Sequence, residues 1–404
     1  MKIVIAGTAW PMRGGIAQYN SLLYKYFSVK HDVKVYSFKV QYPEFLFPGK
    51  TQFEEGNTSS PFPPGKNIVS INSVNPFNWI INGFKFSGEK ADLIIFKYWL
   101  PFFAPAYFTI SFIAKLFSKA KVLVICDNII PHEKRFGDRF FTKLFFSQVS
   151  YFIVQSKTVE EDLKQFNKSK PYKLIPHPVY NIFGEKVSKE EGVKFLNENF
   201  VGREKDAGPP IKAFGGTNLF QGTINSEDKI ILFFGYIRKY KGLGYLIDAM
   251  KTLKEENIKL IVAGEFYEDE EKYRKQIIDN DLSRNIFVIS DFLPDDKIKY
   301  LFSASDVVVL PYVSATQSGI IQAAYNFDKP VIATDVGGLA EVVINNKTGY
   351  IIESENVKEI SDSVLKFYKE NKVEEFTENV KQEKKKYTWE EFVKNAETLV
   401  DHSH

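Results

Sequence analysis

Residues 229–242 read KIILFFGYIRKYKG, and this stretch decides the fold. It opens with a lysine and a continuous apolar run that ends in glycine, which is typical of a strand buried on both faces of a parallel sheet. A helical pattern follows at Leu243–Leu253. The chain begins in the same way, because the short apolar run Lys2–Ala6 ends in glycine and apolar residues recur at helical spacing over Ile16–Phe27.

Further apolar runs follow each of these two openings, with helical patterns between them. Such alternation predicts parallel sheets flanked by helices. Because the pattern restarts, we expect two Rossmann-like α/β domains facing a central cleft, with ligands bound at the carboxyl ends of the strands. The predicted strands are Val33–Phe38, Leu93–Phe96, Val122–Cys126 and Phe152–Val154 in the first half, and Leu260–Ala263, Ile286–Ile289, Val307–Leu310 and Val331–Ala333 in the second.

The pattern also predicts domain boundaries. We expect an N-terminal domain over residues 1–180, a linker with an insertion over residues 181–227, and a C-terminal domain over residues 228–379. The linker shows no strong period and contains Gly-Pro-Pro at Gly208–Pro210, which is typical of a flexible connection. The stretch near the C-terminus is charged and helical, with Trp389 as its large apolar anchor.

The composition excludes several classes of protein. A chain of 404 residues with 44% hydrophobic and 25% charged residues is typical of a globular protein of two or three domains. Cys126 is the only cysteine, which excludes an internal disulfide and argues against a Cys/His metal site. The uncharged stretch Leu100–Ala114 contains two prolines and is shorter than the ~20 residues of a spanning helix, so we expect a buried helix there. No signal peptide is recognisable, and a cytoplasmic protein is expected.

Charge is distributed unevenly along the chain. Residues 1–180 hold 23 Lys and Arg against 12 Asp and Glu, a net charge of +11, whereas the remainder carries −8. The same stretch holds 22 of the 37 Phe. A basic, aromatic half favours peripheral contact with an anionic membrane surface, on the inner face of the membrane. A solvated basic surface over an aromatic core explains the composition equally well, and no nucleic-acid motif is present.

Two glycine-rich turns follow the opening strands. Gly14 and Gly15 precede the first helical pattern, where backbone N–H groups can approach a phosphate at the positive end of a helix. A simple tight turn is the alternative, because the spacing of a dinucleotide fingerprint is missing. In the second half, Arg238 and Lys241 follow the strand directly, at the edge of the expected cleft. Arg can clamp two phosphate oxygens and Lys supplies a compact charge, whereas Lys239 fits a solvated loop.

A third motif spans Pro311–Val343, PYVSATQSGIIQAAYNFDKPVIATDVGGLAEVV. A polar loop ends at Ser318 and opens a helix over Ile320–Tyr325, whose free N–H groups point toward any ligand above the sheet. Gly337 and Gly338 make a second tight turn into a short helix. Two such turns in succession predict an anion-binding wall, and two ordinary strand-to-helix turns are the alternative.

These motifs, in this order, resemble glycosyltransferase family 4, the retaining group 1 glycosyltransferases of the GT-B fold. The resemblance rests on Gly-x-x-Arg-x-x-Lys-Gly after the strand, on DFLPDD at residues 291–296 and on the third motif, and it covers most of Ile230–Ile352. It implies two Rossmann-like domains, the first for the acceptor and the second for the donor. It also implies that the C-terminal helix, about residues 380–404, crosses back to complete the first domain.

The resemblance implies an activity and a site. The enzyme would move a sugar from a nucleotide-sugar donor to a glycan or lipid-linked acceptor, in polysaccharide or glycolipid biosynthesis, without metal or other cofactor. His132, Arg238 and Lys241 would be catalytic, the last two by binding the donor diphosphate. A lone His beside Pro is otherwise more often a structural loop residue. The other donor-binding residues implied are Gly14, Gly15, Asp291, Phe292, Leu293, Ser314, Ser318, Gly319, Ile320, Ile321 and Gln322.

The sequence departs from the family at two positions. Ser314 and Gln322 stand where the family usually carries two glutamates eight positions apart. Gln322 can still hydrogen-bond a ribose hydroxyl, but Ser314 is too short to replace Glu directly. A catalytically silent relative that binds a nucleotide or a partner is therefore the alternative function. An epimerase or a phosphorylase of the same fold is a further alternative.

Overall fold

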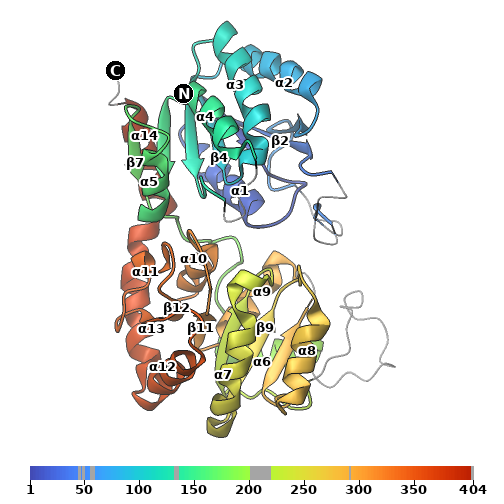
Figure 1. Ribbon diagram of the computed structural model, residues 1–404, viewed down its shortest axis with the longest axis vertical. Coiled ribbons are helices and arrows are strands. Elements are labelled where there is room, and N and C mark those ends of the chain that lie inside the picture. The colour runs from blue at the N-terminus through green and yellow to red at the C-terminus, as the bar shows by residue number, and fades with distance from the viewer. Residues whose placement is uncertain are drawn as a thin grey trace. The chain divides into compact units, whose positions relative to one another are not determined.

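The computed structural model of the chain consists of two compact units (Figure 1). Unit 1 is Met1–Pro178 with Tyr387–His404, and unit 2 is Val179–Lys386. The chain therefore returns to unit 1 near its C-terminal end. The structure describes residues 1–43, 47, 51–54, 60–131, 136–200, 220–290 and 293–401.

Unit 1 is built on a parallel sheet of seven strands in the order β3-β2-β1-β4-β5-β6-β7. Its central strands are apolar and buried, as the continuous runs in the sequence predict. Its two edge strands, β3 and β7, carry polar residues and are partly exposed. The strands are β1 (Lys2–Gly7), β2 (Asp32–Val40), β3 (Asn67–Asn72), β4 (Leu93–Tyr98), β5 (Lys121–Cys126), β6 (Tyr151–Val154) and β7 (Tyr172–Leu174).

The helices of unit 1 pack in two groups. Helices α2, α3 and α4 lie side by side, and α1 packs against α14 (Figure 1). Phe96 belongs to the core that α3 and α4 cover, whereas Lys97 faces Tyr19 of α1. Because successive strand residues point to opposite faces, the two groups cover opposite faces of the sheet. The helices are α1 (Gly15–Phe27), α2 (Pro76–Glu89), α3 (Ala104–Phe117), α4 (Asp138–Gln148), α5 (Lys157–Lys164) and α14 (Trp389–Asp401).

The uncharged stretch Leu100–Ala114 forms a helix, as expected. A 3-10 turn over Pro101–Phe103 leads into α3, and Tyr107 and Ile110 are fully buried. Among the described residues, no helix has both the length and the apolar character needed to cross a membrane.

Unit 2 is built on a parallel sheet of six strands in the order β10-β9-β8-β11-β12-β13. Counted from β8, this is the Rossmann order 3-2-1-4-5-6, and the first six strands of unit 1 have the same order. The prediction of two Rossmann-like parallel sheets is confirmed. The strands are β8 (Lys229–Phe234), β9 (Ile258–Ala263), β10 (Ile286–Ile289), β11 (Val307–Leu310), β12 (Val331–Thr334) and β13 (Gly349–Ile352).

Two pairs of helices flank this sheet. Helix α7 packs against α12, and α6 packs against α9. The main core lies under α7 and α12, where Leu246, Ile247 and Phe367 meet the apolar side chains of the central strands. The helices are α6 (Lys189–Phe200), α7 (Leu243–Leu253), α8 (Glu270–Asp279), α9 (Asp295–Ala304), α10 (Gly319–Asn326), α11 (Leu339–Val342), α12 (Val357–Lys369) and α13 (Lys372–Glu383).

Part of the predicted linker over residues 181–227 forms the helix α6. This helix packs so closely on α9 that a Cβ on Gly192 would lie 2.7 Å from the backbone oxygen of Tyr300. Phe195 also stacks on the Tyr300 ring, with centroids 4.2 Å apart. The sequence hides this helix because most of its side chains are polar and the contact depends on a missing side chain. Residues 201–219 of the predicted linker with insertion lie outside the described residues.

Candidate functional site

The loops after β8 and β11 form the candidate site of unit 2. These two strands are neighbours, and the strand order reverses between them. In open parallel sheets, ligands bind outside the carboxyl ends of the strands at this point. The first loop carries Arg238 and Lys241, and the second ends at Ser318, so the structure brings the second and third sequence motifs together.

Gly235, the residue directly after β8, lies where the two motifs meet. Its φ of 101° is in the region that favours glycine. A Cβ there would lie 3.0 Å from Lys241 Nζ and 3.1 Å from Ile320 Cδ1. The missing side chain therefore leaves room for the Lys241 ammonium group and the start of α10 to lie beside the strand end.

Lys241 carries a buried charge. Lys241 is the last residue of a 3-10 turn over Lys239–Lys241. Its Nζ lies 5.6 Å from the centroid of the buried Tyr312 ring. Burial, and then the nearby charge of Arg238, lower the pKa of Lys241 to about 7. No carboxylate of the described residues counteracts this shift. A buried cation without a counter-charge favours the binding of an anion at this position.

Arg238 is exposed at the same loop, and its guanidinium carbon lies 4.8 Å from the centroid of the Tyr267 ring. This contact holds the planar guanidinium group by stacking and cation–π attraction, which a lysine would not reproduce. Lys239 is exposed, as expected for a solvated residue. Sequence analysis did not predict the role of Tyr267, because its only signal is an aromatic residue four positions after β9.

Backbone contacts fix the two loops to each other. The N–H of Val313 donates to the carbonyl oxygen of Tyr240 at 2.7 Å. Gly242 has a φ of 72°, and a Cβ there would lie only 1.9 Å from the carbonyl oxygen of Pro311. The close approach therefore requires glycine, and it sets the distance between the Lys241 turn and the loop that leads to α10.

Helix α10 begins at the candidate site. The hydroxyl of Ser318 caps it by accepting a hydrogen bond from the N–H of Ile320 at 3.3 Å. A Cβ on Gly319 would lie 2.8 Å from the ring of Tyr180, so the missing side chain leaves room for this ring. The helix N-terminus contributes positive potential near Lys241. Ile321 is buried in the same turn.

Gln322 lies in the next turn of α10 and is only 1% exposed. Its side-chain oxygen accepts no hydrogen bond from the residues that the structure describes. A buried acceptor without a donor costs free energy, and a ligand hydroxyl would satisfy it. Ser314 lies in the preceding loop and is partly exposed.

The Gly-Gly turn of the third motif supports the loop from its other side. A Cβ on Gly337 would lie 1.8 Å from the carbonyl oxygen of Ala315, and the N–H of Gly338 donates to the carbonyl oxygen of Thr316 at 3.0 Å. This turn therefore shapes the β11–α10 loop by contacting its backbone directly.

Three of the predicted site residues lie outside the described residues: His132, Asp291 and Phe292. Leu293 is described and is buried just before α9. In unit 1, Gly14 is the N-cap residue of α1 with a φ of 97°, and Gly15 is the first residue of that helix. The glycine turn before α1 therefore forms where the sequence predicts it.

Unit 1 contains a buried polar cluster that sequence analysis missed. Lys97 in β4 is 1% exposed, and its ammonium group lies 2.6 Å from Asp127 Oδ1 and 3.3 Å from the centroid of the Tyr19 ring. Gln155 bonds both Lys97 and the Tyr19 hydroxyl. The ring of His177 packs edge-on against Tyr19, and burial, then the charge of Lys97, lower the His177 pKa to about 3. The available signal was that Asp127 and Gln155 directly follow β5 and β6.

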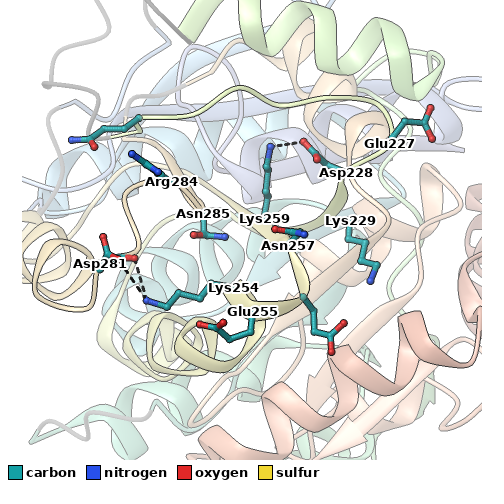
Figure 2. Close-up of a pocket in the computed structure, with 12 residues that line it drawn as sticks. Glu227, Asp228, Lys229, Lys254, Glu255, Asn257, Lys259, Asp281, Arg284 and Asn285 are labelled. Atoms are coloured by element: carbon teal, nitrogen blue, oxygen red, sulfur yellow. Dashed lines mark hydrogen bonds and ion pairs between the residues drawn. The ribbon is translucent and has the colours of Figure 1, made fainter.

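A hollow elsewhere in unit 2 does not fit an anionic ligand. It lies at the opposite, amino ends of β8, β9 and β10, and its volume of about 940 Å³ would hold a nucleotide sugar (Figure 2). Its lining contains five acidic and four basic side chains, and Lys259 pairs with Asp228 while Lys254 lies 3.9 Å from Asp281. These pairs leave little positive field for a diphosphate.

The described part of the chain contains no group of three or more His, Cys, Asp or Glu side chains that could hold a metal ion. The positive groups at the candidate site are thus Arg238, Lys241 and the N-terminus of α10.

Comparison with known proteins finds a family match for the part of the chain that carries the second and third motifs. Residues 216–387 match the family model of the glycosyl transferases group 1. An uncharacterized glycosyltransferase of Methanocaldococcus jannaschii is 30% identical over 176 residues, which are 43% of this chain and 45% of that relative. A second one from the same organism is 32% identical over 40% of this chain and 45% of its own length. The chain thus spans less than half of these two relatives.

Similarity over the whole chain is weaker but continuous. A third uncharacterized glycosyltransferase of M. jannaschii is 24% identical over 99% of this chain and 97% of its own length. Among solved structures, Anabaena HepE in complex with UDP superimposes with a TM-score of 0.71 at 16% identity, covering 99% of this chain and all of that one. Sucrose-phosphate synthase from Thermosynechococcus elongatus gives 0.69 at 14% identity, covering 100% and 99%. The predicted GT-B fold class is confirmed.

Proposed function

We propose that this protein is a glycosyltransferase that moves a sugar from a nucleotide-sugar donor to a glycan or lipid-linked acceptor, with retention of configuration. The match of residues 216–387 to group 1 glycosyl transferases and the GT-B fold support the reaction class. The conclusion rests chiefly on Lys241, whose buried ammonium group lies beside Gly235 and the start of α10 with no carboxylate acting on it. A donor diphosphate supplies the missing negative charge.

The proposed donor site assigns roles to most of the residues that the sequence predicts. Arg238 and Lys241 bind the diphosphate with charge-assisted hydrogen bonds, each worth roughly 1.5–3 kcal/mol. Ser318, Gly319, Ile320 and Ile321 present the first turn of α10 to the same group. The buried oxygen of Gln322 accepts a hydrogen bond from a ribose hydroxyl. The resemblance to the family adds Gly14 and Gly15 as proposed contacts of the phosphates, and Asp291, Phe292 and Leu293 as proposed contacts of the nucleobase.

The chemistry proposed for this site is stabilisation of a leaving group. As the bond between sugar and phosphate breaks, negative charge grows on the diphosphate, so both cations bind the transition state more tightly than the ground state. The departing phosphate accepts the proton of the acceptor hydroxyl on the face from which it leaves, which retains the configuration. His132 is proposed to contact the reacting sugar. His132→Ala should lower turnover at least about tenfold and leave nucleotide affinity unchanged, as expected for a transition-state contact.

The donor nucleotide is the first property to test. UDP is our first candidate, because the fold neighbour HepE has been crystallised with UDP. Thermal unfolding should be measured with UDP, GDP and ADP, because a ligand that binds the folded state raises its stability by mass action. We expect one nucleotide to raise the Tm of the protein and Arg238→Ala to abolish this rise. If no nucleotide does so, the proposed donor site is wrong.

Ser314 and Gln322 support the second candidate function, a silent protein that binds a nucleotide without transferring sugar. In this case the nucleotide raises the Tm, but no sugar is released from any nucleotide sugar in the presence of acceptors or water. Ser314→Glu together with Gln322→Glu restores the usual carboxylates. Sugar release that appears only in this double variant would establish the silent protein and exclude the transferase.

A membrane-bound acceptor would account for the basic, Phe-rich first half of the chain. We therefore include contact with an anionic membrane surface in the proposed function, as a property of unit 1 when the acceptor is lipid-linked. The localisation proposed is peripheral, on the inner face of a membrane.

A further inference from the structure

Helix α2 exposes an apolar row to solvent. Phe77, Ile81 and Phe84 recur at helical spacing and are 79%, 53% and 53% exposed. Gly83 and Phe86 of the same helix are buried in unit 1. A row of large apolar side chains at this spacing normally faces a core. In α2 the helix has two apolar faces, and only one of them is covered by the protein.

Helix α3 continues this exposed surface. Phe112, Leu116 and Phe117 are 47%, 63% and 60% exposed. The two helices pack closely, since a Cβ on Gly83 would lie 2.6 Å from Cβ of Ile113, and they lie side by side in Figure 1. The exposed rows touch where the Phe84 and Phe117 rings lie 5.3 Å apart. We call these six side chains the apolar patch: Phe77, Ile81, Phe84, Phe112, Leu116 and Phe117.

Positive charge borders the apolar patch. Lys85 follows Phe84, Lys119 follows Phe117 by two residues, and both are exposed. Neither forms an ion pair with any described residue. The acidic residues closest in sequence to Lys85 are engaged elsewhere: Glu89 accepts hydrogen bonds from Lys34 and Tyr36, and Asp92 accepts one from the backbone of Lys2. Asp127, the acidic residue closest in sequence to Lys119, pairs with Lys97. The border of the patch thus presents cations without neighbouring anions.

We propose that the apolar patch, with Lys85 and Lys119, is the surface by which unit 1 docks on an anionic lipid membrane. Aromatic and leucine side chains enter the boundary between headgroups and acyl chains, and lysines at the rim are attracted by anionic headgroups. Lysine at the rim favours lipid over a protein partner, because protein–protein interfaces are depleted in lysine. The apolar patch would thus attach unit 1 to the membrane surface, and no part of the patch would cross the membrane.

This inference rests on the membrane contact in the proposed function and not on the transfer reaction. Vesicle binding can be measured without a sugar donor. Nucleotide-induced stabilisation of unit 2 reports separately on the donor site, so the two proposals can fail independently.

The test is co-sedimentation with vesicles of equimolar phosphatidylglycerol and phosphatidylcholine, compared with vesicles of phosphatidylcholine alone. We expect stronger binding to the anionic vesicles and release by salt, because exposed charges are screened over about 8 Å at physiological ionic strength. Equal binding to both kinds of vesicle, or binding to neither, would overturn the proposal.

Two double variants locate the surface. Phe84→Ser with Phe117→Ser should weaken binding to anionic vesicles by about tenfold, because two half-exposed rings no longer insert. Lys85→Gln with Lys119→Gln should weaken it by a similar factor of about tenfold through charge alone. The matched controls lie on α8 of unit 2: Ile278→Ser, at a residue 54% exposed, and Lys275→Gln, at an exposed lysine.

The controls should bind as the unchanged protein does. Each variant must keep the ligand-free Tm and the circular dichroism spectrum of the unchanged protein, which excludes a folding defect. If both patch variants sediment normally with anionic vesicles, the surface is wrong. If the phenylalanine variant instead abolishes self-association in analytical ultracentrifugation and leaves vesicle binding unchanged, the patch is an interface between copies of the chain and the lipid proposal is overturned.

Discussion

The ammonium group of Lys241 is buried next to the charge of Arg238, and both lower its pKa, so the charged form of this side chain costs stability. Replacing it with methionine keeps a flexible chain of similar length and removes the charge. We expect Lys241→Met to raise the Tm of the ligand-free protein at pH 6 by about 2–4 °C, the shift that ~1 kcal/mol produces in a domain of this size. The same change should abolish stabilisation by the nucleotide, as measured by thermal unfolding.

Lys239→Met is the matched control for this prediction, because Lys239 is exposed two residues earlier. It should leave both the ligand-free Tm and the nucleotide-induced shift unchanged. A lower Tm for Lys241→Met with intact nucleotide stabilisation would show that the Lys241 charge serves the fold and not the ligand.

The lowered pKa of Lys241 also makes nucleotide binding depend on pH. With a pKa of about 7 for Lys241, much of the amine is neutral at pH 8 in the ligand-free protein. A bound diphosphate favours the charged form and raises that pKa, so binding takes up a proton, and affinity falls as pH rises above about 7. Calorimetry at pH 8 in two buffers of different ionisation enthalpy should detect this uptake.

Lys241→Arg provides the control for proton uptake, since an arginine stays protonated at pH 8. In this variant the measured heat should no longer depend on the buffer. Equal proton uptake by Lys241→Arg and the unchanged protein would assign the titration to another group.

At the scale of elements, the contact between the Lys241 turn and the end of β11 decides the geometry of the site. Gly242 and Gly65 have nearly the same φ, 72° and 75°. A Cβ added to Gly242 would collide with the backbone of Pro311, whereas a Cβ added to Gly65 would have no atom within 4 Å. Gly65→Ala should therefore cost only the left-handed strain, about 1–2 kcal/mol. Gly242→Ala should cost clearly more, measured by urea unfolding, and should weaken nucleotide binding because the two loops must separate. Equal costs for both variants would contradict the close approach.

The elements that sequence analysis found and missed differ in their burial. The strands β1, β4, β5, β8 and β11 are continuous apolar runs, because both of their faces are covered. The edge strands β3, β7 and β13 were not predicted. The first two carry polar residues, and the third, GYII, opens with a glycine, which shortens its apolar run to three residues. Their pairing depends on a neighbouring strand that is distant in sequence, which a local pattern does not contain.

The candidate site shows the same division. Arg238, Lys241 and Ser318 could be predicted, because they directly follow strands or open a helix at the edge where ligands bind. The burial of Lys241 and the unsatisfied oxygen of Gln322 could not, because both depend on how α10 packs beside β8. The sequence indicates which residues lie at the edge of the sheet where ligands bind. It does not indicate whether a side chain there is buried, because burial depends on tertiary packing.

At the scale of the whole molecule, α14 completes unit 1 through Trp389. This residue is 1% exposed, its ring stacks on Tyr26 at 5.6 Å between centroids, and it meets Tyr19 edge-on at 5.0 Å. We expect Trp389→Ala to destabilise unit 1 by about 3–5 kcal/mol. Hydrogen exchange should show faster opening of β1, β4 and β5, while exchange in β8 and β11 is unchanged. Equal acceleration in both sheets would show that the chain unfolds as one cooperative body.

The return of the chain to unit 1 has a consequence for its synthesis. A ribosome that has made residues 1–178 has supplied every strand of the first sheet, but it must still make about 210 residues before Trp389 emerges. At 5–20 residues per second this takes roughly 10–40 s. During that time Tyr19 and Tyr26 lack the indole ring that covers them, and the nascent chain presents an aromatic surface to chaperones. Unit 1 can therefore complete its fold only after the residues of unit 2 have been synthesised.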